Sequence, residues 1–443
     1  MSRPSVIFFN RVYPSDRGAT GRVLRDLARA MARDGWAVTV VTTASVARED
    51  RDGDVRVIRL KSNTKSRNLF TYGAAWVRMM IAGLKLPRPD LIVTMTDPPM
   101  MVVAGGIMAR ARKTKHIHWC QDLYPDLLPS IGIRLPDFMM SGLSALSFNA
   151  MRRCEKIVVI GRCMARQLTK TGLDPKRIAV IPNWPDQELT RTMTDAMNEA
   201  AVEADASIPA KPFEELFKDD GAPKFRVLYA GTIGRAHPIH TIVDAAAILQ
   251  HQCPDIEFVF VGDGPGLDRL AHERARRGLE NIRLLPRQPN RRLRPLMESG
   301  DVHIISMKHD AAGLLVPSKL YSALAVGRPC VFVGPMNSEV AKVISDFHAG
   351  AVVAQGEPET LAQTILTLRM DGNAWHNAHD GSAQAGRIFV PSESINAWIK
   401  RARDVVGRPL TPPSAKPKVT VPTPVAQDNA VQQPPSVTIH AAE

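Results

Sequence analysis

The chain has 443 residues, of which 44% are hydrophobic, so it can bury a sizeable core in each of two or three domains. Its five cysteines are widely spaced and include no CxxC pair, which argues against a disulfide framework or a zinc site and favours a reducing cytoplasm. The first apolar run, residues 6–9, is too short for a secretory signal. No uncharged stretch reaches the roughly 18 to 20 residues of a membrane span.

The net charge of +13 is concentrated in the first part of the chain. Residues 1–185 carry 30 Lys and Arg against 14 Asp and Glu, whereas residues 186–224 carry 4 against 10 and residues 225–443 carry 23 against 20. No motif that mixes aromatic and basic residues accompanies this charge, so nucleic-acid binding is not favoured. A solvated basic surface and a surface for anionic membranes are both compatible with it.

The first part of the chain alternates apolar strands with helical stripes. Residues 6–9 and 37–43 are short apolar or β-branched runs, and the stripe from Val23 to Met31 predicts a helix that ends at Gly35. Further strands are expected at 91–94, 116–120 and 156–160. Because these strands contain few polar residues, they fit a parallel sheet covered on both faces. We therefore predict a Rossmann-like domain over residues 1–185.

A second series of strands and helices follows a change in composition. Residues 186–224 lose periodicity and gain acidic residues, so we interpret them as a linker or insertion. Strands are then expected at 226–230, 257–262, 282–285, 302–306, 330–334 and 351–353, which predicts a second Rossmann-like domain over residues 225–390. A helical segment at 391–407 and a Pro-rich disordered tail at 408–443 complete the prediction of a two-domain α/β protein.

Ligands of open α/β sheets bind in the loops that follow strands. The loop around Gly18 is rich in small residues that let a ligand approach the backbone ahead of a helix, and an ordinary turn with an N-cap is the alternative. His116 and His118 share one face of a strand and, without a third ligand, are expected to be core groups rather than zinc ligands. Asp122 ends that strand, where its carboxylate either faces the cleft as an acid or base or caps the next helix.

The second domain has three candidate phosphate loops. The first combines two glycines with two basic side chains ahead of a helix: Gly231, Gly234, Arg235 and His237. The second, with Gly262 and Gly264, resembles a Gly-rich phosphate loop but is a common pattern. The third is the most specific, because Pro317 suits the first position of a helix and is followed by the hydroxyl of Ser318 and the charge of Lys319.

Four blocks, QDLYPD, YAGTIGRAH, VGDGPG and VPSKLYSALAVGRP, occur in this order. Together they resemble the retaining glycosyltransferase family 4, over roughly residues 5–405, in its bacterial exopolysaccharide and lipopolysaccharide branch of colanic-acid and amino-sugar transferases. The resemblance implies the GT-B fold, in which two Rossmann-like domains face each other across a cleft. It also implies a hexosyltransferase-type enzyme whose second domain binds a nucleotide diphosphate sugar. The first domain would bind a lipid-linked (undecaprenyl-type) or polysaccharide acceptor.

The resemblance implies roles for particular residues. Arg235 and Lys319 would neutralise the diphosphate in place of a metal, so no metal and no cofactor are expected. Ser318 would complete the phosphate site, and the sugar would meet Gly18 and Asp122 across the cleft.

Two departures from the family pattern stand out. Many members carry two Glu eight positions apart, where this chain has Leu314 and Ser322, so a ribose-binding carboxylate is missing at 322. The usual Lys of the first loop of the second domain is also replaced, and His237 lies nearest to its position. Alternatives to a transferase are a nucleotide-sugar 2-epimerase of the same fold and an inactive, basic membrane-associated scaffold.

The segment at residues 135–151 is apolar but too short to span a bilayer. A buried helix explains its apolar residues, and an interfacial helix also explains the basic residues at its ends. The interfacial interpretation places Phe138, Met139, Leu143 and Leu146 at the acyl boundary. We therefore expect peripheral attachment to the cytoplasmic face of the cell membrane.

Overall fold

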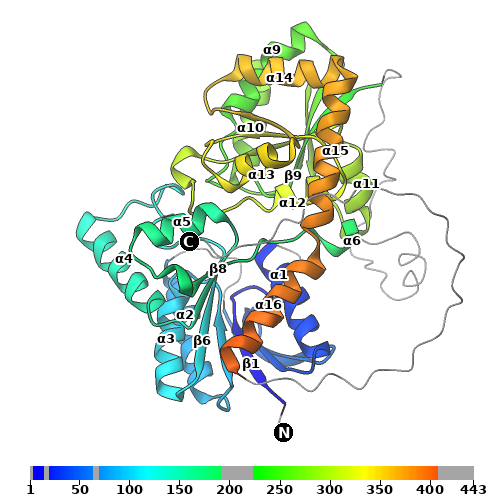
Figure 1. The fold of residues 1–443 in the computed structure, drawn as a ribbon. Coiled ribbons are helices and arrows are strands. Elements are labelled where there is room, and N and C mark those ends of the chain that lie inside the picture. Colours follow the sequence, from blue (N-terminus) through cyan, green and yellow to red (C-terminus); the bar gives the residue numbers. More distant parts are fainter. Residues whose placement is uncertain (1–2, 14–18, 63–68, 191–222, 408–443) are drawn as a thin grey trace, which may run out of the picture.

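The computed structural model of the chain describes residues 3–13, 19–62, 69–190 and 223–407. These residues form two α/β domains, one above the other in Figure 1, each built on a single sheet with helices on its faces. The glycine-rich loop with Gly18, most of the predicted linker and the predicted tail from 408 lie outside the described residues.

The first sheet has eight strands in the order β3-β4-β2-β1-β5-β6-β7-β8, all parallel except for the antiparallel edge strand β3. Its strands are β1 (Ser5–Phe9), β2 (Ala37–Ala44), β3 (Arg48–Asp52), β4 (Val55–Lys61), β5 (Leu91–Thr94), β6 (Lys115–Cys120), β7 (Lys156–Val159) and β8 (Ile178–Val180). Its helices are α1 (Ala19–Arg33), α2 (Leu69–Lys85), α3 (Met101–Arg112), α4 (Asp137–Met151) and α5 (Arg162–Lys170). Short α6 (Gln187–Thr190) follows.

The second sheet has six parallel strands in the order β11-β10-β9-β12-β13-β14. They are β9 (Phe225–Ala230), β10 (Ile256–Gly262), β11 (Ile282–Pro286), β12 (Val302–Ser306), β13 (Cys330–Val333) and β14 (Gly350–Val353). The helices are α9 (His240–Gln252), α10 (Pro265–Arg277), α11 (Leu293–Glu298), α12 (Lys319–Ala325), α13 (Glu339–Phe347), α14 (Pro358–Met370), α15 (Gly372–Ile388) and α16 (Pro391–Val406). The order of the strands changes direction between β9 and β12, which is where ligands of such sheets bind.

Within the described residues, the chain leaves the first domain at residues 184–190 and returns to it in α16, and three buried tryptophans meet at these two segments. Helix α16 returns from the second domain and packs beside α1 of the first (Figure 1). Trp398 on α16 lies 4.7 Å from Trp119 on β6, and Trp119 lies 6.0 Å from Trp184 on the outgoing segment, measured between ring centroids. All three rings are buried, so the outgoing and returning crossings share one apolar contact on the first domain.

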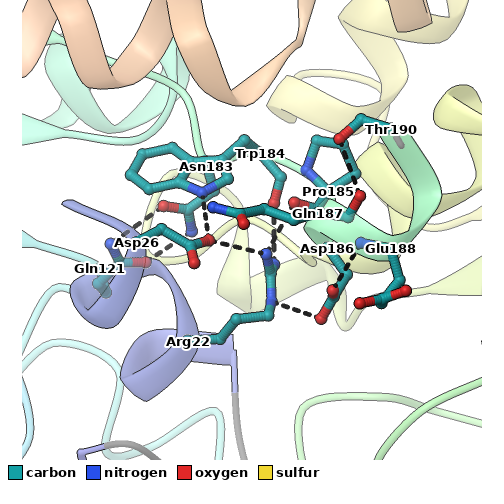
Figure 2. Close-up of polar contacts among 10 residues, drawn as sticks. All are labelled: Arg22, Asp26, Gln121, Asn183, Trp184, Pro185, Asp186, Gln187, Glu188 and Thr190. Atoms are coloured by element: carbon teal, nitrogen blue, oxygen red, sulfur yellow. Dashed lines mark hydrogen bonds and ion pairs between the residues drawn. The ribbon is translucent and has the colours of Figure 1, made fainter. Parts of the chain in front are cut away.

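Polar contacts attach the outgoing segment, residues 184–190, to both domains. Arg22 on α1 reaches it in Figure 2 and donates to the backbone oxygens of Pro185 and Trp184 over 2.7 and 2.9 Å. The indole N–H of Trp184 donates to Asp26 over 2.9 Å. On the other side, Arg294 of α11 donates to the backbone oxygen of Leu189 over 2.9 Å. Residues 184–189 therefore make hydrogen bonds to both domains.

Helix α4 covers most of the apolar segment predicted at residues 135–151. Its last turn is buried at Ser147, Ala150 and Met151, while large apolar side chains near its start stay exposed. In the described part of the chain, no helix is both long and apolar enough to cross a bilayer.

Candidate functional site

The segment after β6 contacts the loop after β12, so the two domains meet at the carboxyl ends of their sheets. Asp122 forms an isolated antiparallel bridge with Leu315, and the backbone N–H of Leu123 donates to the oxygen of Leu314 over 2.8 Å. Lys308 donates to the backbone oxygen of Ser130 over 2.7 Å. This contact brings Asp122 of the first domain against the loop that leads to Lys319 of the second.

Asp122 is half-buried at this contact. Burial, followed by the neighbouring charge of Asp97, raises its pKa from 3.8 to about 7. Asp97 is itself held by Arg11 over 2.7 Å. The alternative role of Asp122 as a helix cap is wrong, because turns follow it and the next helix, α4, begins only at Asp137. A carboxyl with such a pKa can take up or release a proton near neutral pH.

Lys319 begins α12 and points its ammonium toward the end of β9. Its Nζ donates to the backbone oxygen of Thr232 over 3.0 Å and lies 4.9 Å from the ring centroid of Tyr229. A Cβ on Gly231, whose φ is +118°, would lie 3.2 Å from Lys319 Cε, so a glycine lets the lysine pass close to this loop. Burial lowers the pKa of Lys319 to about 8, with Asp263 acting in the opposite direction. Lys319 is therefore mainly charged at neutral pH.

The glycines after β10 pack against the loop after β9. A Cβ on Gly262 would lie 2.2 Å from the oxygen of Gly231, and one on Gly264 would lie 2.8 Å from the oxygen of Ile233. The backbone N–H of Ile233 also donates to the oxygen of Asp263 over 2.8 Å. The close approach of these two loops is sufficient to require glycine here, and phosphate contact by Gly262 and Gly264 stays a prediction.

Two further predicted phosphate ligands are accessible. Arg235 is exposed, half-buried Gly234 precedes it, and within the described residues the guanidinium makes no hydrogen bond or ion pair.

The prediction that Pro317 is the first helical residue is wrong, because α12 begins at Lys319 and Pro317 precedes the N-cap, Ser318. The hydroxyl of Ser318 makes no capping hydrogen bond, so it can contact a ligand.

The imidazole of His237, part of the predicted anion site after β9, is uncharged. Its Nδ1 lies 2.7 Å from the backbone oxygen of Ser306. Burial and the charge of Lys319 lower its pKa to about 3, so the ring is neutral at pH 7. The predicted anion site after β9 therefore takes no positive charge from His237.

His116 and His118 lie in the core of the first domain. The hydroxyl of Thr94 lies 2.8 Å from His116 Nε2 and 3.0 Å from His118 Nδ1. Both rings are buried, which lowers their pKa values to about 3 and about 4. The two histidines are thus hydrogen-bonded core groups.

A contact that the sequence did not predict joins the domains at the start of α5. Glu339 accepts hydrogen bonds from the backbone N–H of Arg162 over 2.6 Å and from its Nε over 2.9 Å. A third bond comes from the backbone N–H of Cys163 over 3.4 Å. Gly161, the N-cap of α5, offers no side chain, and a Cβ there would lie 2.9 Å from Val316. A carboxylate of the second domain therefore caps a helix of the first.

A cavity of about 520 Å³ opens over the carboxyl ends of β13 and β14. It is lined by His309, Gly334, Pro335, Met336, Asn337, Ala354 and Gln355. No predicted site residue belongs to this lining, which lies beside the loop after β12 rather than at the change of strand order.

Comparison with known proteins identifies the class. Residues 18–184 match the glycosyl transferase 4-like domain, and residues 224–371 match the glycosyl transferases group 1. A putative colanic acid biosynthesis glycosyl transferase of Escherichia coli, WcaI, is 27% identical over 292 residues, which cover 64% of this chain and 66% of that protein. A probable glycosyltransferase of Pseudomonas aeruginosa, WbjE, is 22% identical over 306 residues, or 69% and 72% of the two chains.

The fold agrees with this match. HepE of Anabaena, solved in complex with UDP and glucose, superposes with a TM-score of 0.63 at 16% identity and covers 90% of this chain and 100% of its own. The chain belongs to the family 4 glycosyltransferases and has their GT-B fold of two Rossmann-like domains.

Proposed function

We propose that the chain transfers a sugar, with retention of configuration, from a nucleotide diphosphate sugar to a lipid-linked or polysaccharide acceptor. The observation that carries the proposal is the position of two side chains. The ammonium of Lys319 lies where the strand order changes, and Asp122 of the first domain contacts the loop that leads to Lys319. The relation to HepE, which was solved with UDP and glucose, supports a nucleotide sugar as donor. The relation to a putative colanic acid transferase supports a place in bacterial exopolysaccharide or lipopolysaccharide synthesis.

The donor diphosphate would lie against the loops after β9 and before α12. Lys319 and exposed Arg235 would oppose the negative charge that grows on the leaving diphosphate, and Ser318 would donate a hydrogen bond. Gly231 lets Lys319 pass close to this loop, and Gly234 would contact the donor as part of the same loop.

Asp122 would orient or deprotonate the acceptor hydroxyl. Its carboxyl has a pKa of about 7, so the ionised form that can accept a proton is well populated at neutral pH. The contact of its backbone with Leu315 supports this role, because Leu315 belongs to the loop that leads to Lys319.

Asp122→Asn is expected to reduce transfer roughly a hundredfold, the usual order for loss of a general base. It should also remove the rise of the wild-type rate through pH 7, because the titrating carboxyl is gone. Because the folded protein raises the pKa of Asp122, the free energy of unfolding of wild type decreases as the pH rises through 7 and the carboxyl ionises. The Asn side chain does not ionise, so the variant should melt no lower than wild type at pH 8. Rates and melting temperatures from pH 5 to 9 check this, and a variant with unchanged transfer would remove Asp122 from the mechanism.

A surface at the start of α4 suits a membrane that carries the acceptor. Phe138, Met139 and Leu146 are 78%, 42% and 48% exposed, and Leu143 is partly exposed. Exposed Arg134, Arg152 and Arg153 flank the helix. Apolar side chains between basic ends favour binding at the interface of an anionic bilayer. We propose peripheral attachment at the cytoplasmic face of the cell membrane.

The protein is expected to sediment with anionic vesicles at low salt and to be released as the salt concentration rises. Phe138→Ser should weaken this binding roughly thirtyfold, because about 2 kcal/mol of apolar burial is lost. Met370→Ser is the matched control, since Met370 is also 78% exposed but lies on α14 of the second domain. Equal recovery of the wild type from neutral and anionic vesicles would contradict membrane attachment.

A further inference from the structure

The ring of His237 is fixed by a hydrogen bond that defines its tautomer. Nδ1 lies 2.7 Å from the backbone oxygen of Ser306, and a carbonyl oxygen can only accept a hydrogen bond. Nδ1 must therefore carry the hydrogen. In a neutral ring the other nitrogen, Nε2, then has a lone pair and no hydrogen, so it can only accept.

The surroundings of the ring favour this neutral state. Burial withdraws the ring from water, and the ammonium of Lys319 opposes a second positive charge, so the pKa falls to about 3. Lys319 directs its hydrogen bond to the backbone oxygen of Thr232 over 3.0 Å. Among the residues that the structure describes, none donates a hydrogen bond to Nε2 of His237.

The accepting edge of the ring lies along the proposed donor loop. Cδ2, the atom bonded to Nε2, would be 3.5 Å from a Cβ placed on Gly234, and Arg235 follows that glycine. A phosphate oxygen also carries only lone pairs, so it cannot hydrogen-bond to Nε2. A hydroxyl group can donate to it.

We propose that His237 is a specificity-determining residue whose Nε2 accepts a hydrogen bond from a hydroxyl group of the bound donor, on its sugar or on its ribose. The inference rests on the proposed function, because it assumes that a nucleotide sugar occupies the loops after β9. It assigns His237 to hydroxyl recognition and leaves the phosphates to Lys319 and Arg235.

Two variants separate the two nitrogens of the ring. His237→Asn keeps an amide N–H near the position of Nδ1, so the bond to Ser306 can persist while the acceptor at Nε2 is lost. His237→Gln extends an amide oxygen toward the position of Nε2 and retains an acceptor. Thermal melts of both establish that they fold.

Binding is measured by calorimetry with UDP, GDP, UDP-glucose and GDP-mannose, using the full-length chain. For the nucleotide sugar that wild type binds most tightly, His237→Asn should raise Kd about three- to tenfold, and His237→Gln should raise it less. If the hydroxyl belongs to the sugar, the affinity for the nucleoside diphosphate alone is unchanged in His237→Asn. If it belongs to the ribose, that affinity falls by the same factor.

A phosphate contact through protonated His237 predicts different results. Affinity of wild type for the nucleoside diphosphate would rise from pH 8 to pH 6 relative to His237→Asn, and His237→Lys would bind the nucleotide sugar more tightly than wild type. Either result, or an unchanged Kd for the nucleotide sugar in His237→Asn, would overturn the inference while leaving the proposed function intact. Wild type that bound none of these four ligands would count against the proposed function itself and would remove the basis of the inference.

Discussion

Lys319→Ala is expected to lower turnover at least tenfold while the protein stays folded. The ammonium would act on charge that grows on the leaving diphosphate, and a hydrogen bond to a charged group contributes roughly 1.5 to 3 kcal/mol. Because the pKa of Lys319 is about 8, the ammonium is lost as the pH rises through that value, and wild-type kcat/KM should fall above pH 8. Lys319→Arg should remove this alkaline decline, since a guanidinium stays charged.

The control for Lys319 is Lys224→Ala. Lys224 donates to the backbone oxygen of Pro254 and lies just before β9, at the end of the second sheet opposite to the proposed site. Its removal should leave turnover unchanged. Wild-type turnover in purified Lys319→Ala would remove that lysine from the site, and Arg235→Ala, for which a reduction is also expected, tests the second cation in the same assay.

Glu339→Ala is expected to give the largest loss of stability. The side chain of Glu339 is only 7% exposed and accepts three hydrogen bonds from the start of α5 in the other domain. Its removal leaves buried N–H groups without an acceptor and takes a negative charge from a helix N-terminus. We expect a loss of about 2 to 3 kcal/mol, which lowers the melting temperature by roughly 4 to 12 °C.

Asp346→Asn is the matched control for Glu339. Asp346 pairs with the same Arg162 over 2.7 Å, but its side chain is 47% exposed. An exposed ion pair contributes about 0.2 to 1 kcal/mol, so this variant should melt close to wild type. Equal losses in the two variants would show that the carboxylate of Glu339 does not cap α5 in solution.

Buried strands of the sheet could be predicted from the sequence because each is a short apolar run. Strands β5 and β12 have the expected bounds, and both are fully buried. Strand β3 was missed because its five residues, REDRD, are all charged, and only its antiparallel pairing with β4 at the sheet edge makes it a strand. Strand β4 was also missed, because its apolar and basic residues are mixed as in a surface segment. Its place between β2 and β3 in the sheet makes it a strand.

The candidate site could be predicted only as a set of loops. Parallel strands place their carboxyl ends at one edge, which is why Asp122 and the loop before Lys319 could be predicted as site candidates. The structure brings this loop against Asp122 through Leu315. The tautomer of His237 depends on the backbone oxygen of Ser306, 69 residues along the chain, and no local pattern encodes it. The cap that Glu339 provides for α5 spans 177 residues for the same reason.

The central claim is that the protein transfers sugar from a nucleotide diphosphate sugar and stabilises the diphosphate with its own cations. A donor screen on membranes tests this claim most directly. Purified protein is incubated with anionic membranes that contain lipid-linked acceptors and with each nucleotide sugar in turn, with EDTA present, and products are detected by mass spectrometry. We predict a glycosylated lipid and one equivalent of nucleoside diphosphate, at a rate that EDTA leaves unchanged, because Lys319 and Arg235 supply the positive charge. Loss of all turnover in EDTA with recovery on adding one divalent ion, or conversion of the nucleotide sugar to an epimer without release of nucleotide, would contradict the account.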